Sequence, residues 1–202
     1  MRLWYNPASP FARKVRIVAR EAGLAESIEE LSIAVSPVKP QVELARENPL
    51  VKVPALATPD LGTLYDSAVI CEYLDSLHRG TPLFPKAGPQ RWRALRLQAL
   101  GDGIMEAAVL LRYESAWRPQ ALQWSDWIAG QFGKVRGGLN ALEREAAGWD
   151  DSFAIGQITA ACVLGYLDFR FPQEVWRASC PALALWYEGI VRRPSMKATV
   201  PA

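Results

Sequence analysis

The segment RGTPLFPKAGP, residues Arg79–Pro89, decides the fold class because the chain changes character on either side of it. Its three prolines and two glycines disfavour both helix and strand, so we interpret residues 80–88 as a linker. Before the linker, short β-like segments alternate with helical ones, and after it the apolar residues keep helical spacing. The sequence therefore predicts an α/β domain over residues 1–79 and an all-helical bundle over residues 89–202.

The first strand and the first helix have clear local signals. Residues 3–5 (LWY) can form a strand, and Ser9-Pro10 then begins a helix, with serine as the N-cap. Proline is tolerated in the first turn because its missing N–H has no partner there. Gly23 stands where this helix should end.

The rest of the first domain is predicted from turn and capping residues. A second strand is expected within residues 28–33, and two short strands over residues 55–58 and 63–65 flank a PDLG turn. Asp66 and Ser67 begin another helix. Beyond the linker, four apolar stripes step by three and four residues and predict the helices of the bundle: Leu97–Leu111, Trp124–Leu142, Leu164–Phe171 and Leu183–Ile190.

Composition excludes several classes of function. The 202-residue chain carries 23 basic and 21 acidic residues without a basic run, so we expect no nucleic-acid partner. Its cysteines, Cys71, Cys162 and Cys180, are odd in number and far apart, which argues against a disulfide framework and a zinc site. His78 is the only histidine, so we expect neither a histidine-based triad nor a multi-histidine metal site.

The sequence also bears on location. The first residues lack a long apolar run followed by a small-residue cleavage site, so we expect no signal peptide. The longest apolar stretch, residues 160–167, is far shorter than the roughly 18 residues that a membrane span needs. We therefore expect a cytoplasmic protein without a membrane partner.

Four segments, in this order, carry a family resemblance: SPFARKVR (9–16), NPLVKVPAL (48–56), YDSAVICEYLD (65–75) and CPALALWYEGIVRRPSMKAT (180–199). Together they span nearly the whole chain, which resembles the soluble glutathione S-transferases, in particular bacterial-like serine-type members. The resemblance implies a thioredoxin-like N-terminal domain followed by an all-helical C-terminal domain. It also implies glutathione as co-substrate, no metal, and a homodimer.

The resemblance places the cysteinyl part of glutathione against Val53-Pro54. In that family the proline is cis, and the preceding backbone N–H and C=O pair with the tripeptide as an added strand would. Lys52 or Lys39 is expected to meet the glycyl carboxylate. The family often has glycine before Lys-Val-Pro, whereas this chain has Val51, a poor fit for positive φ. If the loop needs a left-handed residue, we expect its shape to differ here.

The resemblance places the γ-glutamyl end of glutathione at Asp66-Ser67. The free N–H groups of a helix N-terminus suit a carboxylate, and the hydroxyl and N–H of Ser67 add to them. Asp66 is expected to face the ammonium. Both residues can also serve as caps, and capping is compatible with binding.

Activating glutathione means stabilising its thiolate, because a free thiol is only slightly ionised near neutral pH. Lowering the thiol pKa by about two units corresponds to roughly 2.7 kcal/mol. A partly buried helix N-terminus supplies up to about 2 kcal/mol, and a hydrogen bond to a charged acceptor about 1.5–3 kcal/mol. A hydroxyl at a helix N-terminus therefore suffices without a general base.

Ser9 meets this description, and we expect it to be the catalytic residue. It stands where omega-like members of the family have cysteine, so a mixed-disulfide mechanism through this position is excluded. Tyr5 and Asn6 are the alternative donors, and a plain helix cap without activation of glutathione is the remaining alternative. Arg13, one turn further on, is predicted to form a salt bridge.

The resemblance implies an electrophile pocket between the two domains, lined by the first strand–helix loop and the fourth helix. The core helix of the family opens Ser/Thr-x-x-Asp, here Thr159 to Cys162, so we expect a weaker cap. Asp168 is considered as a replacement polar anchor or as a plainly exposed residue. The candidates for the pocket are Pro7, Phe11, Met105, Tyr113 and Trp117.

The function implied is a detoxifying glutathione transferase that acts on small hydrophobic electrophiles. A glutathione-dependent peroxidase or lyase would use the same site. A non-catalytic glutathione-binding or regulatory family member is the alternative from another class.

Overall fold

The computed structural model describes residues 1–150 and 152–202. Within these residues, four strands form one sheet with the order β2-β1-β3-β4. β1 lies parallel to β2 and antiparallel to β3, and β3 is antiparallel to β4. The strands are β1 (Arg2–Tyr5), β2 (Glu29–Ser32), β3 (Ala55–Thr58) and β4 (Gly62–Leu64).

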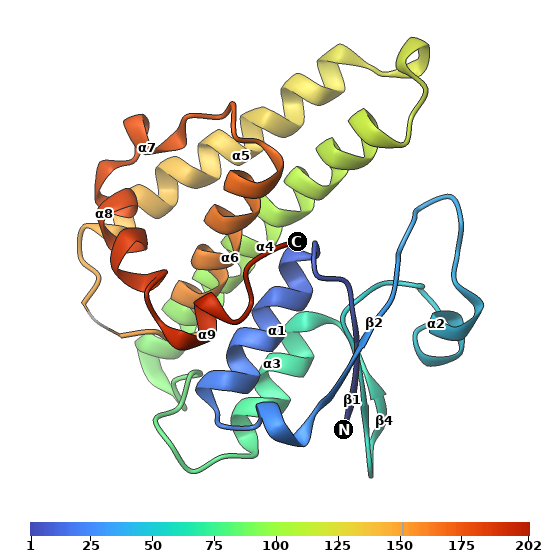
Figure 1. The fold of residues 1–202 in the computed structure, drawn as a ribbon. Helices are drawn as coiled ribbons and strands as arrows, with labels where there is room; N and C mark the ends of the chain where they lie inside the picture. Colours follow the sequence, from blue (N-terminus) through green and yellow to red (C-terminus); the bar gives the residue numbers. More distant parts are fainter. Residues whose placement is uncertain (151) are drawn as a thin grey trace.

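Helices cover both faces of the sheet (Figure 1). Leu3 of β1 packs into the main core with the first and third helices, whereas its neighbour Trp4 packs with Leu44 of the second helix on the opposite face. This alternation is the two-residue period of a strand. The helices are α1 (Pro10–Glu21), α2 (Val42–Glu47) and α3 (Ser67–Ser76).

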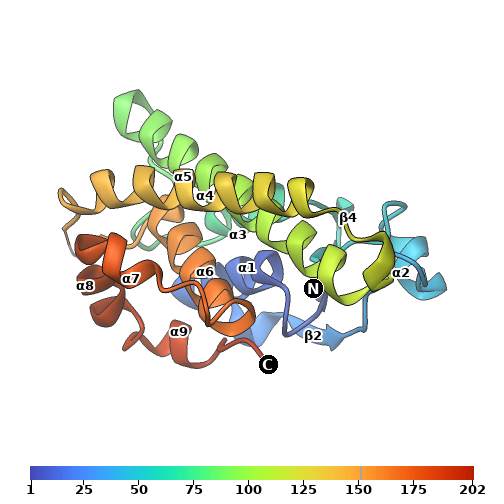
Figure 2. The ribbon, with the colours of Figure 1, turned by 90° about the horizontal axis from the view of Figure 1, so that it is seen from above.

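The second part of the chain is helical, as predicted. Figure 2 shows α6 beside α1 and beneath the long α4–α5 pair. Because α6 contacts α4, α1 and α8, most of its residues are buried. Short 3₁₀ turns cover residues 25–27 and 120–122. The helices are α4 (Gly88–Ala116), α5 (Ser125–Ala146), α6 (Ile155–Arg170), α7 (Trp176–Ser179), α8 (Pro181–Ile190) and α9 (Pro194–Lys197).

The predicted boundaries of α1 are confirmed. Ser9 is the N-cap, and its side chain accepts a hydrogen bond from the N–H of Ala12 at 3.2 Å. Pro10 occupies the first turn. Gly23 follows the last turn with a φ of 71°, a conformation that glycine adopts without steric cost.

The expected cap at Thr159 is wrong. α6 begins at Ile155, so Thr159 lies one turn inside the helix, where its hydroxyl donates to the carbonyl of Ile155 at 2.7 Å. Asp168 is a polar anchor: its carboxylate accepts two hydrogen bonds from Arg177, both of 2.7 Å, and one from the indole of Trp176 at 2.9 Å. These bonds tie the end of α6 to α7.

Polar contacts fasten α1 to the helical region. Lys14 is fully buried and its Nζ lies 2.6 Å from Oδ1 of Asp102 on α4. At the other end of α1, the carboxylate of Glu21 accepts hydrogen bonds from Arg193, at 2.7 and 3.2 Å, and from the hydroxyl of Ser195. The Arg-Pro-Ser sequence thus anchors the C-terminal segment to α1.

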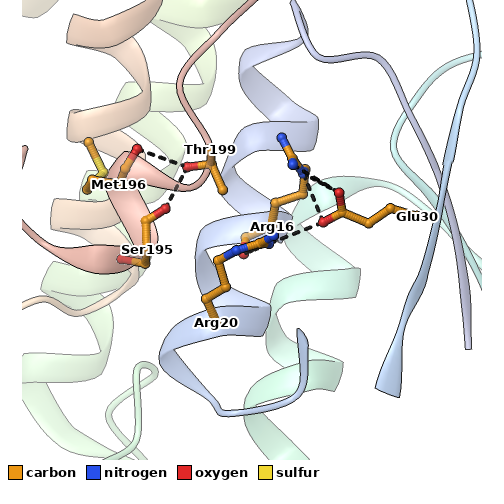
Figure 3. A network of polar contacts seen from close by, with 6 residues as sticks. All are labelled: Arg16, Arg20, Glu30, Ser195, Met196 and Thr199. Atoms are coloured by element: carbon orange, nitrogen blue, oxygen red, sulfur yellow. Dashed lines mark hydrogen bonds and ion pairs between the residues drawn. The ribbon is translucent and has the colours of Figure 1, made fainter. Parts of the chain in front are cut away.

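Figure 3 shows two further networks beside α1. On the sheet side, Arg16 and Arg20 bind the carboxylate of Glu30, which lies on β2. On the other side, the hydroxyl of Thr199 donates to the carbonyls of Ser195, at 2.8 Å, and Met196, at 3.5 Å. The second network closes the turn that follows α9.

The loop before β3 corrects the expectation for Val51. The residue has a φ of 52°, so a valine takes up the left-handed conformation that was expected to require glycine. Its side chain is half-buried and packs against the cluster around Trp4 and Leu44. Packing thus holds a β-branched residue in a conformation that costs about 1–2 kcal/mol.

We predict that Glu21→Gln lowers the free energy of unfolding at neutral pH but not in acid. Burial opposes ionisation of Glu21, but the hydrogen bonds from Arg193 and Ser195 outweigh it and hold the pKa below its usual value. A folded-state pKa below the unfolded one adds stability above the unfolded pKa, and this stability is lost as the pH falls through the folded pKa. Urea titrations at neutral pH and below about pH 4 should show the difference shrinking. Glu26→Gln, at an exposed position, should have little effect at either pH.

We also predict that Val51→Gly is more stable than Val51→Ala by about 1 kcal/mol. Both variants lose the two γ-methyl groups of Val51, and glycine loses one carbon more, but only glycine relieves the strain of positive φ. At Val42, in the first turn of α2 and 70 % exposed, the order should reverse, because alanine favours a helix. Chemical denaturation of the four variants measures this, and an alanine variant at position 51 that is the more stable one would contradict the account.

Candidate functional site

The expected glutathione residues leave the sheet at one edge. The C-terminal end of β1 lies beside the start of β3, since Trp4 pairs with Ala55. The end of β4 lies at the same edge, because Leu64 pairs with Leu56. The N-termini of α1 and α3 and the loop before β3 therefore converge, although they are about 60 residues apart in the chain.

Ser9 combines a capping oxygen with an available proton. Its Oγ accepts from the N–H of Ala12, and its own N–H donates to the carbonyl of Asn6 at 2.9 Å. A hydroxyl accepts and donates at once, so capping leaves its proton free for a ligand. The residue is half-buried.

The side chain of Asn6 is engaged within its own loop, and the ring of Tyr5 is covered by an arginine. The side chain of Asn6 accepts from the N–H of Ala8 at 2.9 Å and donates to the carbonyl of Ile33 at 3.0 Å. The guanidinium of Arg16 stacks on the ring of Tyr5, 4.6 Å from its centroid. Asn6 thus shapes the loop that presents Ser9.

The backbone before Pro54 is open to pairing. The Val53-Pro54 bond is cis. In the described part of the chain, neither the N–H nor the C=O of Val53 takes part in a backbone hydrogen bond. Asn48 fixes the loop, because its amide donates to the carbonyl of Lys52 at 2.9 Å and its Oδ1 accepts from the N–H of Leu50 at 3.0 Å.

α3 begins at the predicted residues. Asp66 is the N-cap, its Oδ1 accepts from the N–H of Ala68 at 3.0 Å, and the Tyr65-Asp66 bond is cis. Asp66 is exposed, whereas Ser67, the first helical residue, is buried. The pair offers a carboxylate to solvent beside a helix N-terminus.

The two candidate lysines lie on different loops. Lys52 precedes Val53, and Lys39 lies in the β2–α2 loop, ahead of α2. Both are exposed. Within residues 1–150 and 152–202, neither forms a salt bridge.

A cavity of about 360 Å³ lies between the β2–α2 loop and the helical region. Its α4 wall follows helical spacing, from Leu110 through Tyr113 to Trp117. Loop residues Pro37 and Val38 close the opposite side. The remaining lining residues are Glu114, Arg118, Pro119 and Trp127.

The charges of the cavity neutralise each other. The carboxylate of Glu114 accepts from Nε of Arg118 at 2.6 Å and from the N–H of Trp124 at 3.1 Å, and the bond from Arg118 holds its pKa below the usual value. Burial raises the pKa of Tyr113, so its hydroxyl remains a donor at neutral pH. The cavity therefore suits an uncharged, apolar compound with a hydrogen-bond acceptor.

Two of the five candidates for the electrophile pocket line this cavity. Tyr113 and Trp117 line it, whereas Pro7 and Phe11 do not. Met105 is fully buried in the core and offers no surface to solvent. The loop residues Pro37 and Val38 were missed, because only the folded chain brings that loop to α4. Leu110 could have been predicted as a lining residue, since it precedes Tyr113 and Trp117 by three and seven residues and therefore lies on the same face of a helix.

The chain's own thiols are shielded. Cys71, Cys162 and Cys180 are free and buried, and burial raises the pKa of each of them. In the residues that the structure describes, no cluster of side chains could hold a metal ion. None of the described helices is both long and apolar enough to cross a bilayer.

Comparisons with known proteins agree with this geometry. Residues 8–77 match the family model of the glutathione S-transferase N-terminal domain, and residues 125–189 match that of the C-terminal domain. A glutathione transferase family member from Pseudomonas fluorescens Pf-5, solved with bound glutathione, is 48 % identical with a TM-score of 0.97, over 100 % of this chain and 98 % of that one.

Two further relatives cover the whole chain. A glutathione S-transferase from Methylobacillus flagellatus KT, solved with glutathione, is 36 % identical with a TM-score of 0.88, over 100 % of this chain and 99 % of that one. The uncharacterized GST-like protein YibF of Escherichia coli K12 is 33 % identical over 205 residues, which cover 100 % of this chain and 98 % of YibF. With both of its domains matched and its fold shared along its whole length, the chain belongs to the glutathione S-transferase family.

Proposed function

We propose that the protein binds glutathione at the sheet edge and transfers it to small apolar electrophiles. The convergence of the α1 N-terminus, the Val53 backbone and the α3 N-terminus carries this proposal. The unpaired N–H and C=O of Val53 suit the cysteinyl peptide groups, and Asp66 and Ser67 suit the γ-glutamyl end. Lys52 or Lys39 receives the glycyl carboxylate. Two glutathione-bound relatives support this assignment.

Ser9 stabilises the thiolate. Its proton is free to donate because its oxygen, not its hydrogen, serves the cap. The thiolate then attacks an electrophilic carbon, a C–S bond forms, and a leaving group departs or the adduct takes up a proton. No general base is required.

The cavity beside Tyr113 and Trp117 is proposed to receive the electrophile. Aromatic walls and a neutralised ion pair favour an apolar, planar compound, and Tyr113 donates to its acceptor group. We expect the protein to work as a cytoplasmic homodimer in detoxification, as the family resemblance implies.

Ser9→Ala should lower kcat/KM for an aryl halide by about 10- to 100-fold, because the thiolate, a charged acceptor, loses a hydrogen bond. Alanine also removes the cap, which costs about 1 kcal/mol of stability. Ser9→Gly separates the two effects, because glycine at an N-cap costs only a few tenths of a kcal/mol. Equal activity losses in both variants, measured in steady-state assays, assign the effect to the hydroxyl, and an unchanged rate in the glycine variant removes Ser9 from the mechanism.

Trp117→Ala should raise KM for an aromatic electrophile at least about tenfold, because burying an aromatic side chain contributes about 1.5–3 kcal/mol. The KM for glutathione should stay unchanged. Trp92→Ala is the matched control, since Trp92 is 70 % exposed near the other end of α4 and does not line the cavity. Equal effects of the two substitutions would place the electrophile elsewhere.

A further inference from the structure

Arg13 is a buried cation without a carboxylate partner in the described part of the chain, so its predicted salt bridge is wrong. The residue is 4 % exposed and lies in the first half of α1. Its Nη2 donates to the carbonyl of Met196 at 3.4 Å, while Nε and Nη1 are buried without a hydrogen-bond partner. Among the described residues it forms no salt bridge.

The packing around Arg13 is specific. A Cβ at Gly165 of α6 would lie 1.9 Å from Nη1 of Arg13 and 3.0 Å from the hydroxyl oxygen of Tyr187. Only glycine leaves room there for the guanidinium. The side chain of Arg13 thus extends from α1 into the helical region at the position where Gly165 leaves room for it.

The neighbouring groups do not neutralise this charge. Burial raises the pKa of Tyr187 and raises that of Cys162 to about 11, so both stay protonated at neutral pH. Lys14, the adjacent cation on α1, is already paired with Asp102 of α4.

Two further carboxylates on the helices around Arg13 are committed, and a third, Glu188 of α8, is exposed to solvent. Asp168 of α6 binds Arg177, and Glu21 of α1 binds Arg193 and Ser195 of the C-terminal segment. An arginine does not lose its proton in a protein, so the positive charge persists. The guanidinium of Arg13 therefore places an uncompensated positive charge on the side of α1 that faces the interior.

We propose that Arg13 is a positioning residue that stabilises the glutathione thiolate beside Ser9 through the field of its uncompensated charge; this rests on the proposed function. Arg13 follows Ser9 by four residues, about 6 Å along the axis. Its long side chain extends sideways from the helix, so we place the guanidinium on the order of 10 Å from a sulfur at the N-terminus. At an effective dielectric constant of about 20, a unit charge at that distance shifts a pKa by about one unit. Arg13 thus adds to the helix dipole and to the Ser9 hydroxyl.

The test is the pH dependence of thiolate absorbance in the ultraviolet for bound glutathione. Arg13→Gln, which removes the charge but keeps a donor for Met196, should raise the pKa of the bound thiol by about one unit. Arg13→Lys, which keeps the charge, should retain most of the lowered value. Arg20→Gln is the matched control, because Arg20 lies further along α1, pairs with Glu30 and is partly exposed, and should leave the thiol pKa unchanged.

The results of this test distinguish the role of the Arg13 charge from the proposed function. A thiol pKa in Arg13→Gln equal to that of the wild type, or equal rises in Arg13→Gln and Arg13→Lys, overturns the role of the charge while leaving the proposed function intact. A wild-type protein that binds glutathione without lowering its thiol pKa contradicts both proposals.

Should Arg13→Gln not fold, two measurements still decide. Salt screens buried charges poorly, so the wild-type thiol pKa should stay constant with ionic strength, and Arg13→Lys should keep its low value. A wild-type value that rises steeply with salt, or a lysine variant with an ordinary thiol pKa, rules the proposal out.

Discussion

The antiparallel pairing of β3 with both β1 and β4 is the constraint on which the candidate site depends. It brings the end of one strand beside the start of the next, so two helix N-termini and an unpaired loop meet at one sheet edge. Shifting the β1–β3 register by one residue would move Trp4 to the wrong face and separate Ser9 from Val53. The position of the site therefore depends first on the pairing of the strands and only then on individual side chains.

The second constraint is the attachment of α1 to the helical region. Ser9 is the N-cap of α1, and the contacts of Lys14 with Asp102 and of Glu21 with Arg193 hold the middle and the C-terminal end of the helix. Removing one partner of a buried ion pair leaves an uncompensated charge at considerable cost, which makes this attachment specific. The N-terminus of α1 is thus held by the helical domain as firmly as by the sheet.

Local chemistry explains which parts could be predicted from the sequence. Ser9-Pro10, Gly23 and Asp66 gave correct helix boundaries, because caps act within a few residues of their helix. Thr159 was misplaced since its hydroxyl bonds back inside the helix, which capping rules do not anticipate. The features that could not be predicted depend on packing between residues far apart in the chain. This packing holds Val51 at positive φ, and it buries Arg13 against Gly165. It also closes the cavity with Pro37 and Val38, which lie about 75 residues before Tyr113 in the chain.

The burial of the three cysteines bears on how the protein responds to alkylating agents and oxidants. A thiol reacts with alkylating agents and oxidants as the thiolate and from an accessible position. Cys71, Cys162 and Cys180 meet neither condition, since each is buried and each has a raised pKa. Reactive carbon compounds that inactivate enzymes with exposed sulfhydryls should leave the three thiols of this polypeptide unmodified.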